Sequence, residues 1–197
     1  DDLQYAWFNG MGYCAWENIW GIWNGIAPRY AETIRRMHLI YSRYPDIFHS
    51  EGWEPHTPVL QNGVFASKFP GDGQTLWTFV NRDKQSKSGQ QIQLAYVPGV
   101  IYYDLWNGIK LSPVRKGSSV ILSFAMEGYG YGALLLVNDK KAKKDLPGFL
   151  SKIRQMAKVP LNSLPDQGHF LPQHLVYIAP TVPRRTTPPG MVLIPAA

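Results

Sequence analysis

The middle of the chain consists of short apolar segments separated by residues that form turns. Within it, residues 75–80 and 91–94 alternate between apolar and polar side chains, which is the pattern of a strand with one buried face. Clusters containing glycine separate the segments, as turns require. This pattern predicts an antiparallel β-sandwich, with strands at residues 64–69, 75–81, 91–97, 100–106, 119–126 and 131–137. We expect Trp77 and Trp106 in its core.

Before this region, the sequence predicts a strand, a loop and a helix. Residues 12–16 form a short apolar and aromatic run typical of a buried strand, and residues 17–25 carry the glycine and asparagine of a loop. Pro28 fits the first turn of a helix and Pro45 ends it. Between them, apolar side chains recur three or four residues apart on one stripe: Tyr30, Ile34, Met37, Tyr41 and Tyr44. This unit is one βα step of a larger α/β structure, and we expect its neighbours to precede residue 1.

After the sandwich, the sequence predicts one short helix and a proline-rich tail. Asp145 is a candidate N-cap, Pro147 fits the first turn, and Pro160 stops the helix. Frequent prolines over residues 160–190 predict an extended linker. The fold class is therefore an α+β fragment: a terminal βα unit, an antiparallel β-sandwich, a short helix and a Pro-rich tail. The expected divisions are residues 1–58, 59–138, 139–159, 160–190 and 191–197.

Composition and charge narrow the classes of partner. The 197 residues are 45% hydrophobic and 17% charged, which is typical of a globular protein. The net charge of +6 comes partly from a lysine run over residues 140–144 and from Arg184 and Arg185, which indicate solvated loops. Because no nucleic-acid recognition motif accompanies them, we expect no nucleic-acid partner. No apolar stretch approaches the roughly 20 residues of a membrane span, and we expect no membrane partner.

Two motifs and the order of the elements carry a resemblance to a known class of protein. Residues 102–108, Y-D-L-W-N-G with a preceding tyrosine, resemble the "Y-D-L-W-T-G" turn of the C-terminal sandwich in TIM-barrel glycoside hydrolases. Residues 75–82 resemble the "L-x-V-x-N-R" strand of the same sandwiches. The resemblance covers residues 7–137 and implies a last barrel strand and helix followed by the sandwich. It also implies that residues 102–108 form a structural hairpin, and that the acid and nucleophile come from earlier strands, so that the fragment is inactive alone.

The end of the chain resembles a different family. Residues 189–196, P-G-M-V-L-I-P-A, are similar to the opening of formylglycine-generating (sulfatase-modifying) domains, "P-x-G-M-V-x-I-P-A-G", but lack one residue between the proline and the glycine. This resemblance implies that a further domain starts here. None of that domain's functional residues falls within this chain.

The resemblance to barrel enzymes places the candidate site at the end of the expected strand, because barrel active sites lie at the C-terminal ends of strands. Glu17 is the only carboxylate between Asp2 and Glu32, so it is the candidate catalytic residue; it could instead accept a sugar hydroxyl or pair with a nearby arginine. Trp16, Trp20 and Asn18 are candidate substrate-binding residues. Indoles stack on sugar rings, but they also serve as core residues, and two further indoles, Trp7 and Trp23, lie nearby.

We expect no metal site and no cofactor, since the five histidines and single cysteine match no ligand spacing. Three functions remain open. The first is the tail of a carbohydrate-active enzyme, and the second is a non-catalytic module that binds glycans or positions a neighbouring domain. The third places the main activity in a formylglycine-generating domain after residue 190. In each, the expected partners are carbohydrate and the rest of the parent chain, and the sequence assigns no compartment.

Overall fold

The computed structural model describes residues 2–13, 26–168, 174–180, 182, 184 and 186–195. Its strands form two antiparallel sheets, as the alternating pattern predicts. The five-stranded sheet has the order β1-β2-β8-β4-β5 and the three-stranded sheet the order β3-β7-β6. The strands are β1 (Val64–Gly71), β2 (Gln74–Asn81), β3 (Gln90–Ala95), β4 (Val100–Asp104), β5 (Ile109–Leu111), β6 (Val114–Lys116), β7 (Ser119–Ser123) and β8 (Tyr131–Asn138).

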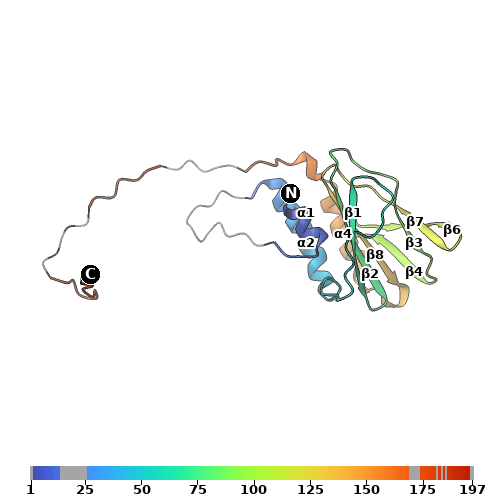
Figure 1. Ribbon diagram of the computed structural model, residues 1–197, viewed down its shortest axis with the longest axis horizontal. Coiled ribbons are helices and arrows are strands. Elements are labelled where there is room, and N and C mark those ends of the chain that lie inside the picture. Colours follow the sequence, from blue (N-terminus) through green and yellow to red (C-terminus); the bar gives the residue numbers. More distant parts are fainter. Residues whose placement is uncertain are drawn as a thin grey trace.

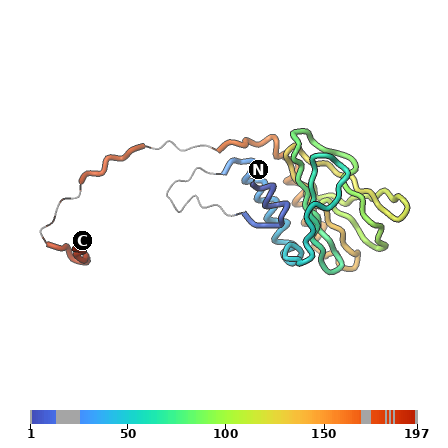
Figure 2. Tube along the Cα trace, viewed as in Figure 1, coloured from blue at the N-terminus to red at the C-terminus, as the bar shows by residue number. Residues whose placement is uncertain are grey.

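The helices form a third layer, on the face of the five-stranded sheet that the second sheet does not cover (Figure 1). Two helices that are far apart in the sequence, the one that begins at Pro28 and the one that begins at Leu146, lie side by side in this layer (Figure 2). The helices are α1 (Asp2–Phe8), α2 (Pro28–Arg43), α3 (Pro45–Phe48) and α4 (Leu146–Ala157), with short 3-10 turns η1 (Asp139–Lys141) and η2 (Leu161–Ser163).

Strand β2, which lies inside the five-stranded sheet between β1 and β8, explains why three layers are needed. Every residue of β2 from Leu76 to Asn81 is buried. Trp77 and Phe79 belong to the core between the two sheets, whereas Leu76 and Val80 belong to the core under the helices. Each of these two faces needs an apolar cover, because a strand that is buried on both sides must be packed on both sides.

The structure confirms several elements and differs at the N-terminus. Helix α2, the helix after Asp145 and the burial of Trp77 between the two sheets are as predicted. Trp106 is also buried, at 4% exposure, but it lies in the core under the helices and not in the core of the sandwich. The strand expected over residues 12–16 is wrong for Gly12 and Tyr13, which lie outside any strand, and its other three residues lie outside the described part of the chain. The sequence missed α1, which buries Leu3 and Trp7 against the sheet.

The chain stays packed beyond the predicted helix end. Leu161 is fully buried in the helical core, and the Arg29 amide at the start of α2 donates to the Pro165 carbonyl at 3.0 Å. Residues 160–165, expected to begin the linker, are therefore part of the folded body. The apolar side chains of residues 175–178, by contrast, are at least 79% exposed.

The turn between β4 and β5 is the Y-D-L-W-N-G motif, and its organising residue is Asp104. One carboxylate oxygen, Oδ1, accepts hydrogen bonds from the amides of Trp106 and Asn107, both at 3.0 Å, and Oδ2 accepts from Asn107 Nδ2 at 2.7 Å. Gly108 has φ of 67°, and a Cβ there would collide with the Leu150 carbonyl of α4. The turn thus closes a hairpin and receives the last helix, as expected of a structural motif.

Complete burial makes the stability of this turn depend on pH. Burial raises the pKa of Asp104 to about 6, in spite of its three hydrogen bonds. The folded chain therefore holds this proton more tightly than the unfolded chain. Protonation of Asp104 therefore adds to the free energy of unfolding as the pH falls through about 6, and this addition is lost as the pH rises through the same value.

We predict that Asp104→Asn removes roughly 1–3 kcal/mol of the gain in unfolding free energy between about pH 7 and pH 4, since asparagine does not titrate. Urea denaturation of both proteins at the two pH values measures this difference. The same change in unfolding free energy with pH in the two proteins would contradict the assignment.

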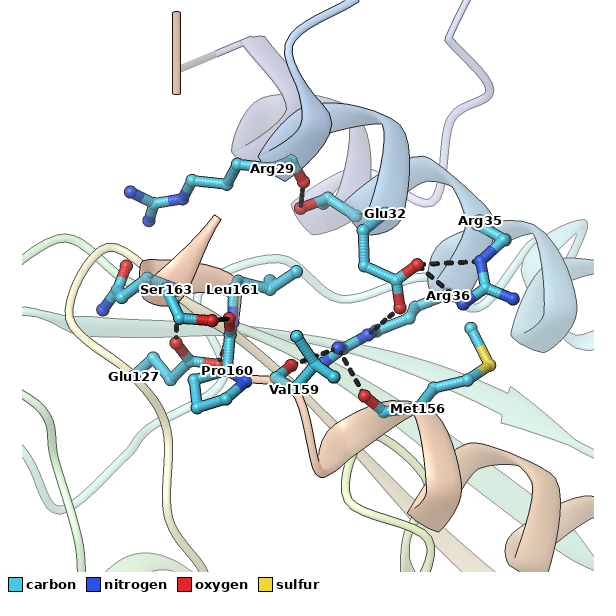
Figure 3. A network of polar contacts seen from close by, with 12 residues as sticks. Arg29, Glu32, Arg35, Arg36, Glu127, Met156, Val159, Pro160, Leu161 and Ser163 are labelled. Carbon is cyan, nitrogen blue, oxygen red and sulfur yellow. Dashed lines mark hydrogen bonds and ion pairs between the residues drawn. The ribbon is translucent and has the colours of Figure 1, made fainter. Parts of the chain in front are cut away.

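A buried arginine joins α2 to the end of α4. Arg36 is 2% exposed, and its Nη2 donates to the carbonyls of Met156 at 2.8 Å and Val159 at 2.7 Å, while Nε donates to Glu32 at 2.8 Å (Figure 3). The last carbonyls of a helix have no partner within it, so Arg36 supplies the missing donors. The first amides of a helical turn likewise lack acceptors, and the Glu127 carboxylate supplies them for η2 by accepting from the amides of Leu161 and Asn162.

Replacement of this arginine should separate α4 from α2. We expect Arg36→Met to lower the free energy of unfolding by about 2–4 kcal/mol, because it leaves buried carbonyls without donors while keeping the aliphatic volume. Arg35→Met is the matched control, since that side chain is 59% exposed and pairs with the same glutamate; its effect should stay below about 0.5 kcal/mol. Urea denaturation measures both, and equal losses would show that Arg36 is not the joining residue.

Candidate functional site

The candidate residues of the sequence analysis, Trp16, Glu17, Asn18 and Trp20, lie outside the described part of the chain. The neighbouring indole Trp7 is described and is a core residue. It is fully buried, its Nε1 donates to the Gly132 carbonyl at 3.0 Å, and its ring packs against Trp106 at 5.5 Å. Trp7 therefore fixes α1 to the sheet and offers no face to a ligand.

A cavity of about 370 Å³ borders the described end at Tyr13. It lies between the end of α1, α2 and α3, and its walls are mostly apolar, with His38 and His49 as the imidazoles. Burial raises the pKa of Tyr41, another wall residue, whose hydroxyl donates to the Ala6 carbonyl at 3.3 Å. The polar groups of this cavity are thus few, and those of Tyr41 and His38 make hydrogen bonds within the fold.

A second cavity, of about 390 Å³, combines aromatic and polar side chains. We call it the aromatic groove. It lies where α1 crosses the ends of β1 and β2, and its volume falls in the range of roughly 300–1,000 Å³ that small-molecule sites occupy. The lining residues are Gln4, Tyr5, Phe8, Asn9, His56, Phe65, Val80 and Arg82.

Docking of α1 on the sheet creates the groove. Gln4 is 2% exposed, and its Nε2 donates to the Asn81 carbonyl at 2.9 Å. Thr78 Oγ1 donates to the Phe8 carbonyl at 3.4 Å, at the other end of the helix. With α1 held in this way, Tyr5 remains 59% exposed and Phe65, on β1, remains 42% exposed.

A loop residue in a rare conformation completes one wall. His56 has φ of 55°, in the left-handed region that few residues other than glycine adopt. Its ring lies 4.9 Å from that of Phe8 and 6.2 Å from that of Phe65. Two hydrogen bonds between Glu54 and Lys68, each 2.9 Å, hold the loop before it against β1. Strained residues that their surroundings hold in place concentrate at functional sites.

Arg82 also lines the groove. Its guanidinium carbon lies 5.2 Å from the centre of the Tyr5 ring, and its Nη1 donates to Gln4 Oε1 at 3.0 Å. The groove therefore offers exposed aromatic faces, the amide of Asn9 and an oriented guanidinium. Among the described residues, its lining contains neither aspartate nor glutamate.

This arrangement suits binding rather than hydrolysis. Glycoside hydrolysis requires a pair of carboxylates, which the lining lacks. Within the described part of the chain, no group of histidine, cysteine, aspartate and glutamate is placed to hold a metal ion. No described helix has the length and apolar character needed to cross a bilayer.

Sequence reasoning missed this groove because its residues come from four separate segments. The signal that could have revealed part of it is the spacing of Leu3 and Trp7, which places both on one face of a short helix and leaves Tyr5 on another. Nothing in the sequence brings Phe65 or His56 to that helix.

No protein-family model and no curated protein matches this chain. Solved structures with partial similarity include an α-amylase from H. orenii, with 18% identity and a TM-score of 0.37, which covers 53% of this chain and 20% of that one. An α-amylase from Anoxybacillus has 12% identity and a TM-score of 0.38 over 55% and 23% of the two chains. A GH30 endoxylanase from Clostridium papyrosolvens has 14% identity and a TM-score of 0.33 over 56% and 28%.

The chain thus spans between 20% and 28% of the length of these glycoside hydrolases. At such TM-scores and identities the likeness says nothing about activity. A function for this chain has to be inferred from its own residues.

Proposed function

We propose that this chain is the accessory sandwich part of a carbohydrate-active, glycoside hydrolase-like protein, and that it contacts carbohydrate through the aromatic groove. The observation that carries the proposal is the composition of that groove: exposed Tyr5 and Phe65 faces beside the amide of Asn9 and the guanidinium of Arg82. Sugar rings present C–H faces that pack on aromatic rings and hydroxyls that bond to amides and guanidinium groups.

The turn motif supports the structural half of the proposal. The Asp104 carboxylate accepts hydrogen bonds that close the hairpin, and Gly108 leaves room for the backbone of α4. This fits the role that the resemblance to barrel-enzyme sandwiches implies for residues 102–108. In this proposal the helical layer lies between the sandwich and a preceding barrel.

Catalysis, in this proposal, belongs to the parent protein. The groove has no carboxylate in its described lining, so the chain alone should not cleave glycosidic bonds. Glu17, with Trp16, Asn18 and Trp20, would contribute to a cleft shared with the barrel. Glu17 would act there as a catalytic carboxylate or as an acceptor for a sugar hydroxyl.

A second candidate function is a non-catalytic module attached to a formylglycine-generating domain. The observation that favours it is the apolar run from Met191 to Ile194, whose four side chains are 68% to 87% exposed. Exposed apolar runs of this kind usually pack into another structure. The glycan contact at the aromatic groove would be the same in both candidates.

We predict that Tyr5→Ala and Phe65→Ala each weaken binding to oligosaccharides about tenfold, the loss expected when one aromatic platform of about 1.4 kcal/mol is removed. Isothermal titration calorimetry with neutral and acidic oligosaccharides of one length measures the association constants. The same samples should release no reducing sugar.

The matched control is Tyr96→Ala. Tyr96 is 40% exposed and lies under Arg115 at 4.0 Å, so it copies the tyrosine–arginine pair of the groove at another place on the surface. Its replacement should leave binding unchanged. The proposal fails if no oligosaccharide binds, or if Tyr96→Ala weakens binding as much as the two groove variants do.

A further inference from the structure

We infer that the aromatic groove selects sugars that carry a carboxylate, the uronic acids, and that Arg82 is the residue that binds this group. The inference rests on the proposed carbohydrate function, and it adds the class of sugar and the residue that binds the carboxylate of that sugar. It depends on three features of Arg82: its orientation, its lack of an acidic partner and its place beside the aromatic faces.

The orientation of Arg82 is fixed by a buried amide. Gln4 Nε2 donates to the carbonyls of Asn81, at 2.9 Å, and Gly130, at 3.3 Å. These two hydrogen bonds fix the orientation of the amide and therefore the position of its Oε1. That oxygen accepts from Arg82 Nη1 at 3.0 Å. The Tyr5 ring supports the guanidinium from one side. Among the described residues, Gln4 is the one hydrogen-bond partner of the guanidinium, which leaves the edge formed by Nε and Nη2 for a second partner.

No described carboxylate neutralises the charge of Arg82. Among the described residues, no carboxylate forms an ion pair with Arg82, whereas Arg35, Arg36 and Arg43 all have one. The neighbouring Asp83 is paired with Lys87. An oriented guanidinium without an ion-pair partner among the described residues, in a groove without carboxylates in its described lining, complements an anion.

The surroundings of Arg82 restrict that anion to one borne on a ring. Val80 contributes a buried apolar side chain, 4% exposed, and the rings of Phe65 and His56 also line the groove. A free inorganic anion would leave these apolar surfaces unused. A sugar ring packed on the aromatic side, with its carboxylate toward the planar fork of Arg82, uses both.

The test compares each acidic sugar with its own methyl ester, which keeps the ring and removes the charge. The probes are trigalacturonic acid and a xylotriose that carries a glucuronic acid branch, each as the acid and as the ester. We expect the acid of at least one pair to bind about three- to tenfold more tightly than its ester, as for an accessible, well-oriented ion pair. Raising the salt from about 20 mM to about 300 mM should reduce this ratio.

Arg82→Gln should bring the ratio of acid to ester close to one; because both ligands are measured on the same variant, a loss of hydrogen bonding that is common to acid and ester cancels in this ratio. Arg82→Lys should keep part of the preference, since it keeps the charge and loses the fork. Arg115→Gln is the matched control, because Arg115 also lies over a tyrosine ring, and it should leave the ratio unchanged. Circular dichroism melting of each variant verifies that it is folded.

Each outcome decides between the inference and the function on which it rests. If acid and ester bind equally in both pairs, the groove binds sugars without selecting acids, and the inference is overturned while the proposed function stands. A preference that persists in Arg82→Gln would place the selecting residue elsewhere, and so also overturns it. If none of the four probes and no neutral oligosaccharide binds, the proposed function itself is wrong.

Discussion

The five-stranded sheet must be packed against other elements on both of its faces. Strand β2 lies inside the sheet, and all of its residues from Leu76 to Asn81 are buried. The three-stranded sheet covers one face, and helices from opposite ends of the chain cover the other. Since β2 contributes apolar side chains to both cores, removing either cover would expose part of the same strand to water. The helices and the sandwich are therefore parts of one folded body.

Buried polar side chains fix how the layers meet. Apolar packing alone would tolerate sliding between helices and sheet, but hydrogen bonds from buried donors have defined directions. Gln4 fixes α1 on the end of β2, Arg36 fixes α4 against α2, and Asp104 shapes the turn that receives α4. The aromatic groove is a consequence of the first of these contacts. A change in the position of α1 would separate Tyr5 from Arg82 and Phe8 from His56.

The sequence predicted the parts of the fold that local patterns encode. Alternation located the main strands, prolines marked the starts of α2 and α4, and glycine clusters marked the turns. It missed the three-residue strands β5 and β6 and the seven-residue α1, because such short elements give too few positions to establish a period. It also placed the end of the packed body too early, since the burial of Leu161 depends on the distant Glu127 and Arg29 contacts.

The candidate site was less accessible to prediction. A resemblance to barrel enzymes directed attention to residues 16–20, where glutamate, asparagine and tryptophan suggest sugar chemistry, and these remain candidates within the parent protein. The groove itself joins residues from the first helix, a loop near residue 56 and the strands β1 and β2. Tertiary contacts bring those segments together, and no spacing in the sequence records such contacts.

The central claim is that carbohydrate contacts this chain at the aromatic groove. Mapping of backbone amide shifts by NMR, as trigalacturonic acid and a neutral xylo-oligosaccharide are added in turn, tests it most directly. The account predicts that the amides of Tyr5, Asn9, His56, Phe65 and Arg82 move with a common dissociation constant, while those around Tyr96 and Arg115 stay in place. Shifts confined to any other surface, or no shifts with either sugar, would contradict it.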